Sequence, residues 1–193
     1  EQELFNMDEL VEAFSIERVS KSGAKFDLEK AHWFNHRYIS KLSASQLSKL
    51  FLPILIEKNV EVCTDYVEEV CELIKDRIIL ITDLWSQSHF FFEDPLHYDE
   101  KVVAKVWKAE TPALLKDFAS MLENVQPFTS QNIHDLTAEF VQNKGIGMGQ
   151  LMNPFRLCVV GTNAGPGMFD MAQVIGKEYI IPRIYKAIET IKA

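Results

Sequence analysis

The amino-acid sequence predicts an all-α fold, a bundle or cage of packed helices. Apolar residues recur at intervals of three and four along most of the chain, whereas the alternating pattern of a β-strand is almost absent. Side chains that can cap the first turn of a helix precede several of these segments. Because 47% of the 193 residues are hydrophobic, the chain can bury a substantial core.

The N-terminal segments begin with recognisable helix caps. Asn6 with Glu9 makes a capping box for a helix over residues 7–14. Asp27 can cap a second helix over residues 28–39. We therefore expect two helices before residue 40.

Two longer helical segments follow. Ser43 precedes residues 44–59, where Pro53 should kink or divide the helix. Residues 65–85 form the next helical segment, which has a wide apolar stripe. The stripe consists of Val67, Val70, Cys71, Ile74, Ile78 and Ile81.

The chain changes character in residues 88–101, which are aromatic and rich in turn-forming residues and are predicted to form a connection. Thr111 and Pro112 then mark the start of a helix, with Thr111 as the cap and Pro112 at the first helical position. The most plausible division of the chain lies near residues 108–125, although no flexible linker marks it.

The last third is predicted to be helical as well. Ser130 opens a helix over residues 131–144, which Gly145 is placed to stop. A further helix can begin at Met168 after a glycine-rich segment. The final segment, residues 177–193, places Ile180, Ile184, Ile188 and Ile191 on one face.

Composition argues for a soluble, cytoplasmic protein. Apolar runs such as residues 78–81 are far shorter than a membrane span, and the acidic first residues are unlike a signal peptide. Its three cysteines support neither a disulfide framework nor a zinc site. The net charge is −8, but residues 141–193 carry six basic and three acidic side chains, so the excess negative charge lies in residues 1–140.

The segment RLCVVGTNAGPGMFD, residues 156–170, has the outline of a strand, a phosphate-binding loop and a helix. It lacks the lysine and the hydroxyl of a P-loop, and its glycine spacing is not that of a dinucleotide-binding loop. We expect a rigid turn that exposes its backbone and presents Met168 and Phe169 as apolar surface. The alternative is a plain connection between two helices.

The sequence offers no recognisable catalytic or metal-binding set. Glu68 and Glu69 lie opposite an apolar face and are typical of a solvated helix surface. His32 and His36 have the spacing of two metal ligands, but Trp33 replaces the glutamate of the HExxH motif. We therefore predict no catalytic residue and no metal site.

Arginines and aromatics near turns favour RNA binding. Arg77 interrupts an apolar stripe, and Arg156 stands directly before the glycine-rich segment. An arginine can pair with phosphate, and it can also stack on an unstacked base and donate to its edge. The alternatives are that Arg77 pairs within its own helix with Glu72 or Asp76, and that Arg156 only steadies the turn.

The chain also carries motifs of a known family over essentially its whole length. Its N-terminal part resembles the region after the second ATP-site signature of bacterial-type glutamyl-tRNA synthetases, which have the pattern F-D-x-x-K-x-x-W-x-N. Here that pattern consists of Phe26, Asp27, Lys30, Trp33 and Asn35. The last fifty residues are similar to the final lobe of that family, with G-x-x-x-x-P-x-R, P-G, G-K-E and R-I in order. One departure is Val160-Gly161-Thr162, where the family usually has Thr-Gly.

The resemblance implies a stem-contact remnant in residues 1–40 and two helical anticodon-binding subdomains in residues 41–115 and 116–193. It implies that the chain recognises the anticodon loop of glutamate tRNA, with the catalytic domain elsewhere in the same polypeptide. The HIGH and KMSKS signatures are absent from the 193 residues, so ATP and Mg²⁺ are expected to serve the parent enzyme and not this part.

The resemblance also suggests site residues. The positions that match anticodon contacts in the family are Arg77, Arg156, Gly165, Pro166 and Met168. Those that match the region near the tRNA stem are Lys30, Trp33 and Asn35.

Two other functions stay open from the sequence. The first is a non-enzymatic helical module that binds protein through its acidic surface, and the second is a complete small enzyme. A salt titration separates RNA binding from the first, because release of counterions makes RNA binding fall steeply with salt.

Overall fold

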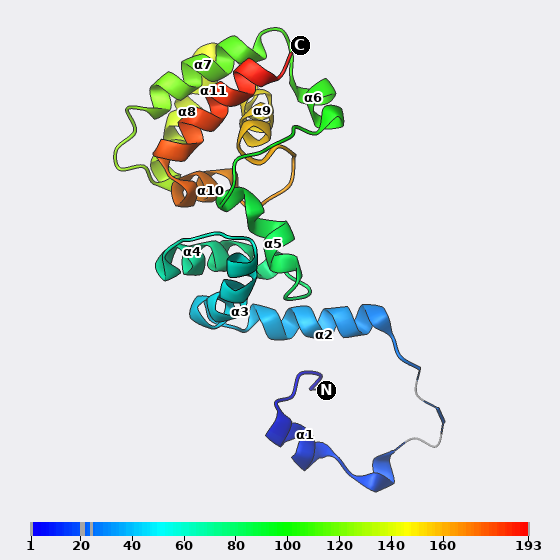
Figure 1. Ribbon diagram of the computed structural model, residues 1–193. Helices are drawn as coiled ribbons and strands as arrows, with labels where there is room; N and C mark the ends of the chain where they lie inside the picture. The colour runs from blue at the N-terminus through cyan, green and yellow to red at the C-terminus, as the bar shows by residue number, and fades with distance from the viewer. Residues whose placement is uncertain (1, 20–21, 24, 193) are drawn as a thin grey trace.

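The computed structural model describes residues 2–19, 22–23 and 25–192, and over these residues it contains eleven α-helices, three 3-10 helices and no β-strand. The predicted all-α fold is confirmed. The helices form two lobes, and the N-terminal helix lies apart from both (Figure 1).

The N-terminal segment contains α1 (Met7–Ala13) and the 3-10 helix η1 (Ile16–Arg18). The first lobe contains α2 (Leu28–Ser40), α3 (Ala44–Glu57), α4 (Thr64–Ile74), η2 (Lys75–Arg77) and α5 (Asp83–Ser88). The η3 turn (His89–Phe91) opens the connector, which we define as residues 89–99. The second lobe contains α6 (Glu100–Val106), α7 (Thr111–Leu122), α8 (Ser130–Lys144), α9 (Met148–Val160), α10 (Met168–Ile175) and α11 (Lys177–Thr190).

The capping residues explain where most helices begin. The Asn6 and Glu9 side chains form the expected capping box at α1, and Asp27 accepts from the backbone N–H of Lys30 at α2. Gly145 ends α8 in the left-handed conformation, as expected. The cap of α8 is Thr129, however, and not Ser130, because the Thr129 hydroxyl accepts from the backbone N–H of Asn132.

Pro53 lies inside α3, which runs undivided from Ala44 to Glu57, so the kink is the part of the expectation that stays a prediction. A second helix feature is corrected by the structure. Thr111 is the first residue of α7 and not its cap, and its hydroxyl accepts from the backbone N–H of Lys108. In both cases the segment is helical as expected, and only the local role of one residue differs.

Residues 65–85 do not form one helix. After α4 ends at Ile74, tertiary hydrogen bonds satisfy the backbone that a continuous helix would have paired internally. The Asp83 carboxylate accepts from the N–H groups of Ile79 and Leu80, at 3.3 and 2.8 Å. His36 Nδ1 lies 2.9 Å from the Ile78 carbonyl oxygen. Side chains from neighbouring elements therefore stabilise an irregular segment here.

The apolar run at residues 157–160 also differs from its sequence outline. It is the last turn of α9 and not a strand, and all four side chains are buried. A short apolar run fits a buried strand or a buried helix equally well, so periodicity alone could not decide.

The core is a single hydrophobic cluster that extends from Ile39 in α2 to Ile191 after α11. In the second lobe, Phe118 lies at the centre of an aromatic group, with ring centroids 5.4 Å from Phe140 and 5.2 Å from Phe155. Helix α10 packs against α8 in its own lobe and against α4 and η3 on the other side. The two lobes therefore share apolar surface through α10.

The expected division between residues 115 and 116 falls inside α7, and this helix packs against α8, α9 and α11 of the second lobe. The division into residues 1–40, 41–115 and 116–193 stays a prediction. The packing of α7 favours a boundary in the connector instead.

Within the described part of the chain, no helix is both long and apolar enough to cross a membrane.

The aromatic group gives a stability prediction. Phe118→Ala removes a fully buried ring, and we expect the free energy of unfolding to fall by about 3–5 kcal/mol. Leu96→Ala is the matched control, because Leu96 is 82% exposed and its loss should change stability by less than about 0.5 kcal/mol. Urea denaturation measures both. Equal losses for the two variants would contradict this description of the core.

Candidate nucleic-acid interface

A tight turn of residues 161–167, the Gly-rich turn, joins α9 to α10 and lies against the connector. Gly161 ends α9 with a φ of +81°, and a Cβ atom there would lie 2.5 Å from the carbonyl oxygen of His97. The Gly161 carbonyl accepts from the backbone N–H of Asp99 at 2.8 Å. Only glycine allows this approach, so the start of the turn is fixed against the connector.

Arg156 reaches from α9 over the same turn. Its Nη1 donates to the carbonyl oxygen of Ala164 at 3.2 Å. Gly165, at φ +116°, leaves the space that the guanidinium occupies, since a Cβ atom there would lie 3.2 Å from Nη1. Phe90 borders the same space, because its Cζ would lie 3.4 Å from a Cβ atom at Gly165. Arg156 does steady the turn, as one of the alternatives proposed.

Arg156 belongs to the second lobe, whereas Arg77 comes from the first. Burial, and after it the positive charge of Arg77, lowers the pKa of the Arg156 guanidinium from its usual value. Two arginine side chains that act on each other in this direction favour a partner rich in hydrogen-bond acceptors.

Arg77 itself is exposed at the end of η2. Within the described ranges it has neither a hydrogen bond nor an ion pair with another side chain. Glu72, one of the two partners considered for it, pairs with Lys75 instead. The intrahelical pairing of Arg77 is therefore not observed, and all its donors can face a ligand.

A hollow of about 300 Å³ next to Arg77 is formed with α2. Its lining residues are His32, Trp33, His36, Asp76, Arg77 and Ile79. The Arg37 guanidinium carbon lies 5.4 Å from the centroid of the Trp33 ring, which is partly exposed. The expected stem-contact helix thus borders the same surface as Arg77.

Lys30 and Asn35, the other two N-terminal candidates, have different surroundings. Lys30 is exposed, with its Nζ 5.6 Å from the centroid of the Phe34 ring. Asn35 is half-buried, and its side-chain amide donates to the carbonyl oxygen of Ile79. Asn35 therefore anchors α2 to the irregular segment after η2, and Lys30 is free to reach a ligand.

The Gly-rich turn exposes different residues from those that we expected. Met168 is only 4% exposed and packs in the core, so it does not provide apolar surface. Pro166 is buried too, and Phe169 is half-buried with its ring centroid 5.1 Å from that of His134. The exposed positions are Asn163, Ala164 and Gly167.

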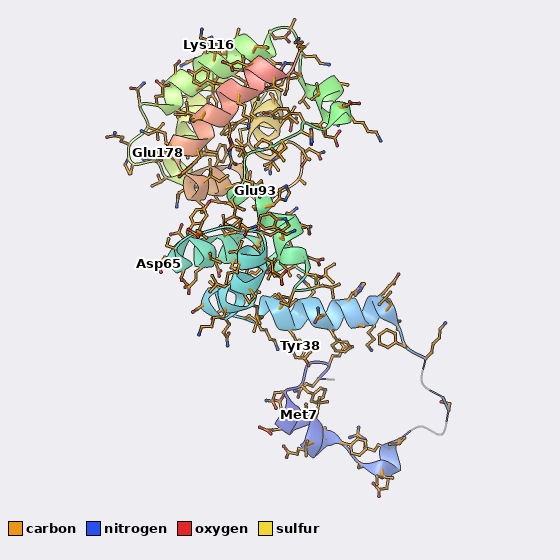
Figure 2. All side chains as sticks on the ribbon, viewed as in Figure 1. Met7, Tyr38, Asp65, Glu93, Lys116 and Glu178 are labelled. Carbon is orange, nitrogen blue, oxygen red and sulfur yellow. The ribbon has the colours of Figure 1, made fainter. Side chains whose placement is uncertain are left out.

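Sequence reasoning gave no role to Arg183 of α11, which is 3% exposed. Its guanidinium donates to the Asp94 carboxylate and to the carbonyl oxygens of Phe90, Glu93 and Val159. Figure 2 labels Glu93, which lies at the junction of the two lobes. The sequence does indicate that Arg183 is buried, because it lies on the same face of the helix as Ile180 and Ile184.

At the N-terminus, Tyr38 of α2 holds the segment that leads into α1, and its hydroxyl donates to the carbonyl oxygen of Phe5 at 2.7 Å. Figure 2 shows Tyr38 on the side of α2 that faces this segment. None of the described residues of α1 is buried. The segment therefore has little core of its own.

The same part of the chain contains thiols and side chains of the types that ligate metals. In the portion described, no three His, Cys, Asp or Glu side chains gather as metal ligands would. Burial raises the pKa of the Cys71 thiol to about 12, and it also raises that of Cys158. Both thiols stay protonated at neutral pH and are poor nucleophiles.

The chain matches known proteins along its length. The family described as "Anticodon binding domain" matches residues 46–188. Glutamate–tRNA ligases of Flavobacterium johnsoniae and Phocaeicola vulgatus are 46% and 44% identical to it, over 99% and 100% of this chain. The chain spans 38% of the length of each of these two relatives.

Solved structures give the same result. A crystal structure of a glutamate tRNA ligase from Elizabethkingia meningosepticum matches with a TM-score of 0.93 and 37% identity, over 97% of this chain and 37% of that one. A glutamate-tRNA synthetase from Elizabethkingia anophelis matches with a TM-score of 0.88 and 34% identity, over 96% of this chain and 36% of that one.

Gly165 offers a test of the turn. Gly165→Ala forces a side chain into a positive-φ conformation and against the Arg156 guanidinium, so we expect stability to fall by about 1–3 kcal/mol. Gly145→Ala is the control, since its φ is also positive but no atom lies within 4 Å of the added Cβ. Thermal unfolding of both variants should show the larger loss at Gly165. A larger loss at Gly145 would count against the packing of Arg156 on the turn.

Proposed function

Because this chain belongs to the anticodon binding domain family, we propose that it forms the part of a glutamate–tRNA ligase that binds the tRNA anticodon. Its cognate RNA is glutamate tRNA, as the names of the similar ligases suggest. The catalytic domain lies elsewhere in the same polypeptide and uses ATP and Mg²⁺. The parent enzyme works in the cytoplasm, where tRNA is charged.

The observation that carries this proposal is the exposed Arg77 side chain, which borders a hollow with Trp33 and has no hydrogen bond or ion pair among the described residues. Unpaired anticodon bases present acceptors on their edges and flat faces for stacking, and arginine can use both. Arg77 has free donors, whereas Arg156 is already oriented by Ala164.

The Gly-rich turn contributes main chain more than side chains. Gly165 and Pro166 fix the backbone, and Asn163 and Ala164 are exposed beside Arg156. A rigid backbone is suited to reading a base edge, because it loses little entropy on binding. Met168 acts indirectly in this proposal, by packing under the turn.

We propose that α2 contacts the stem next to the anticodon loop. Trp33 and Lys30 are the contacts, since both reach solvent and Trp33 borders the hollow that also contains Arg77. Asn35 supports them by holding α2 against Ile79. In this proposal the stem contact Trp33 and the loop contact Arg77 border the same hollow.

A second function, docking to protein, is favoured by the N-terminal segment. Its exposed apolar side chains include Met7, Val11, Phe14, Ile16 and Phe26, and Phe26 is 77% exposed. Clustered apolar exposure marks an interaction site. In this proposal the N-terminal segment before α2 contacts another part of the parent polypeptide, while residues 28–192 contact RNA.

The two arginines give the main test of the proposal. Replacing Arg77 or Arg156 with alanine should cost about 1–3 kcal/mol of binding to glutamate tRNA and narrow the preference over a tRNA with an altered anticodon. The measurement is the dissociation constant for both tRNAs at two salt concentrations. A contact to phosphate alone would weaken both tRNAs equally and reduce the salt slope by about one unit.

Lys116→Ala provides the control, because this exposed lysine lies at the far end of the second lobe (Figure 2). It removes one positive charge and should leave the preference unchanged. Thermal unfolding confirms that each variant is folded. If both folded arginine variants keep the wild-type preference, these residues do not read the anticodon.

A second test asks whether the 193-residue chain has catalytic activity on its own. We expect the 193-residue chain alone to show no ATP–pyrophosphate exchange dependent on glutamate and tRNA, because it contains neither the HIGH nor the KMSKS signature. The same preparation should still bind tRNA, which controls for its integrity. Exchange above background would mean that the chain is a complete enzyme.

A further inference from the structure

We propose that Arg183 is a positioning residue for anticodon recognition, which holds the Gly-rich turn and Arg156 in the conformation that binds RNA. The inference rests on the proposed function. Arg183 lies outside the surface formed by Arg77, Arg156 and the exposed part of the turn. It acts through the backbone that carries this surface.

The Arg183 guanidinium uses each of its three nitrogen atoms. Nε donates to Asp94 Oδ1 at 2.9 Å, and Nη2 donates to the carbonyl oxygen of Glu93 at 3.1 Å. Nη1 donates to the carbonyl oxygens of Phe90 and Val159, at 2.6 and 3.2 Å. One side chain from α11 therefore binds both the connector and the last turn of α9.

The acceptors of Arg183 adjoin the Gly-rich turn from two sides. Val159 lies two residues before Gly161, where the turn begins. Phe90 packs against Gly165, the position on which Arg156 rests. If the connector and α9 shift relative to each other, the space between Phe90 and Arg156 changes with them.

The chemistry of arginine is needed for this arrangement. A guanidinium presents donors in a planar fork, whereas the lysine ammonium presents its donors from one atom. A lysine at position 183 can keep the charge opposite Asp94 but cannot serve the three carbonyl oxygens in their present directions. Phe90 and Val159 are buried, so their carbonyl oxygens would lose partners that water cannot replace.

Lys177 offers a matched comparison on the same helix. Its Nζ also donates to main chain, to the carbonyl oxygens of Glu123 and Val125 at 3.0 and 3.4 Å. These acceptors follow α7 and do not adjoin the Gly-rich turn. Loss of Lys177 should weaken the second lobe without moving Arg156.

The experiment compares four forms of the 193-residue chain: wild type, Arg183→Lys, Asp94→Asn and Lys177→Met. The probes are a glutamate tRNA transcript and the same transcript with an altered anticodon, and the measured quantity is the ratio of their dissociation constants. We expect Arg183→Lys to reduce this ratio by roughly tenfold, since misplacing one base contact removes most of its discrimination. Asp94→Asn should reduce it by a smaller factor.

Lys177→Met should lower the melting temperature and leave the ratio unchanged. The Asp94 side chain is 47% exposed, and asparagine keeps an acceptor oxygen for Arg183 Nε, so we expect Asp94→Asn to fold and to decide the outcome if Arg183→Lys does not fold. If the folded variants at positions 183 and 94 keep the wild-type ratio of dissociation constants, the role of Arg183 is contradicted. The same holds if Lys177→Met lowers this ratio as much as Arg183→Lys does. Either result leaves the proposed function intact. A wild-type chain that binds both transcripts equally would overturn the proposed function, and the inference with it.

Discussion

The arrangement of this molecule depends on one buried positive charge at the junction of its lobes. The connector beyond η3 is irregular, so its carbonyl groups need donors from elsewhere. The Arg183 guanidinium supplies donors to two of them, those of Phe90 and Glu93. Its charge is balanced by the Asp94 carboxylate, whose Oδ2 also lies 3.4 Å from Lys186 Nζ. The end of α9 and the connector are thereby held by the same side chain, and Arg156 lies on the helix that is held in this way.

Much of the fold could be predicted because helices are specified locally. Capping side chains and apolar spacing lie within a few residues of the helices that they define, as at Asn6 and Asp27. The prediction was wrong for residues 78–80, where side chains hold the backbone out of a helix. Asp83 caps this segment from three and four residues away, whereas His36 comes from α2, 42 residues from Ile78, and no local pattern around Ile78 shows that partner in advance. The helical end of α9 was missed for a related reason, since only its neighbours show that it is buried on all sides.

The candidate site could be predicted in part, because the chemistry of an arginine is visible in the sequence. That Arg77 borders a hollow with Trp33 of α2 is a result of how the first lobe packs, and neither segment alone contains it. Met168 was placed on the surface because an apolar residue after a turn can face either way. Arg183 was overlooked although it stands on an apolar stripe, where a charged residue needs buried partners.

Because both lobes contribute to one hydrophobic cluster, neither lobe can be separated from the other without exposing part of the core. Since α10 packs against α4 and η3 as well as α8, a cut through the connector would expose apolar faces on both sides. Residues 39–191 can therefore be exchanged between proteins as a whole but not lobe by lobe. Recombination between the lobes would require two compatible cores at once.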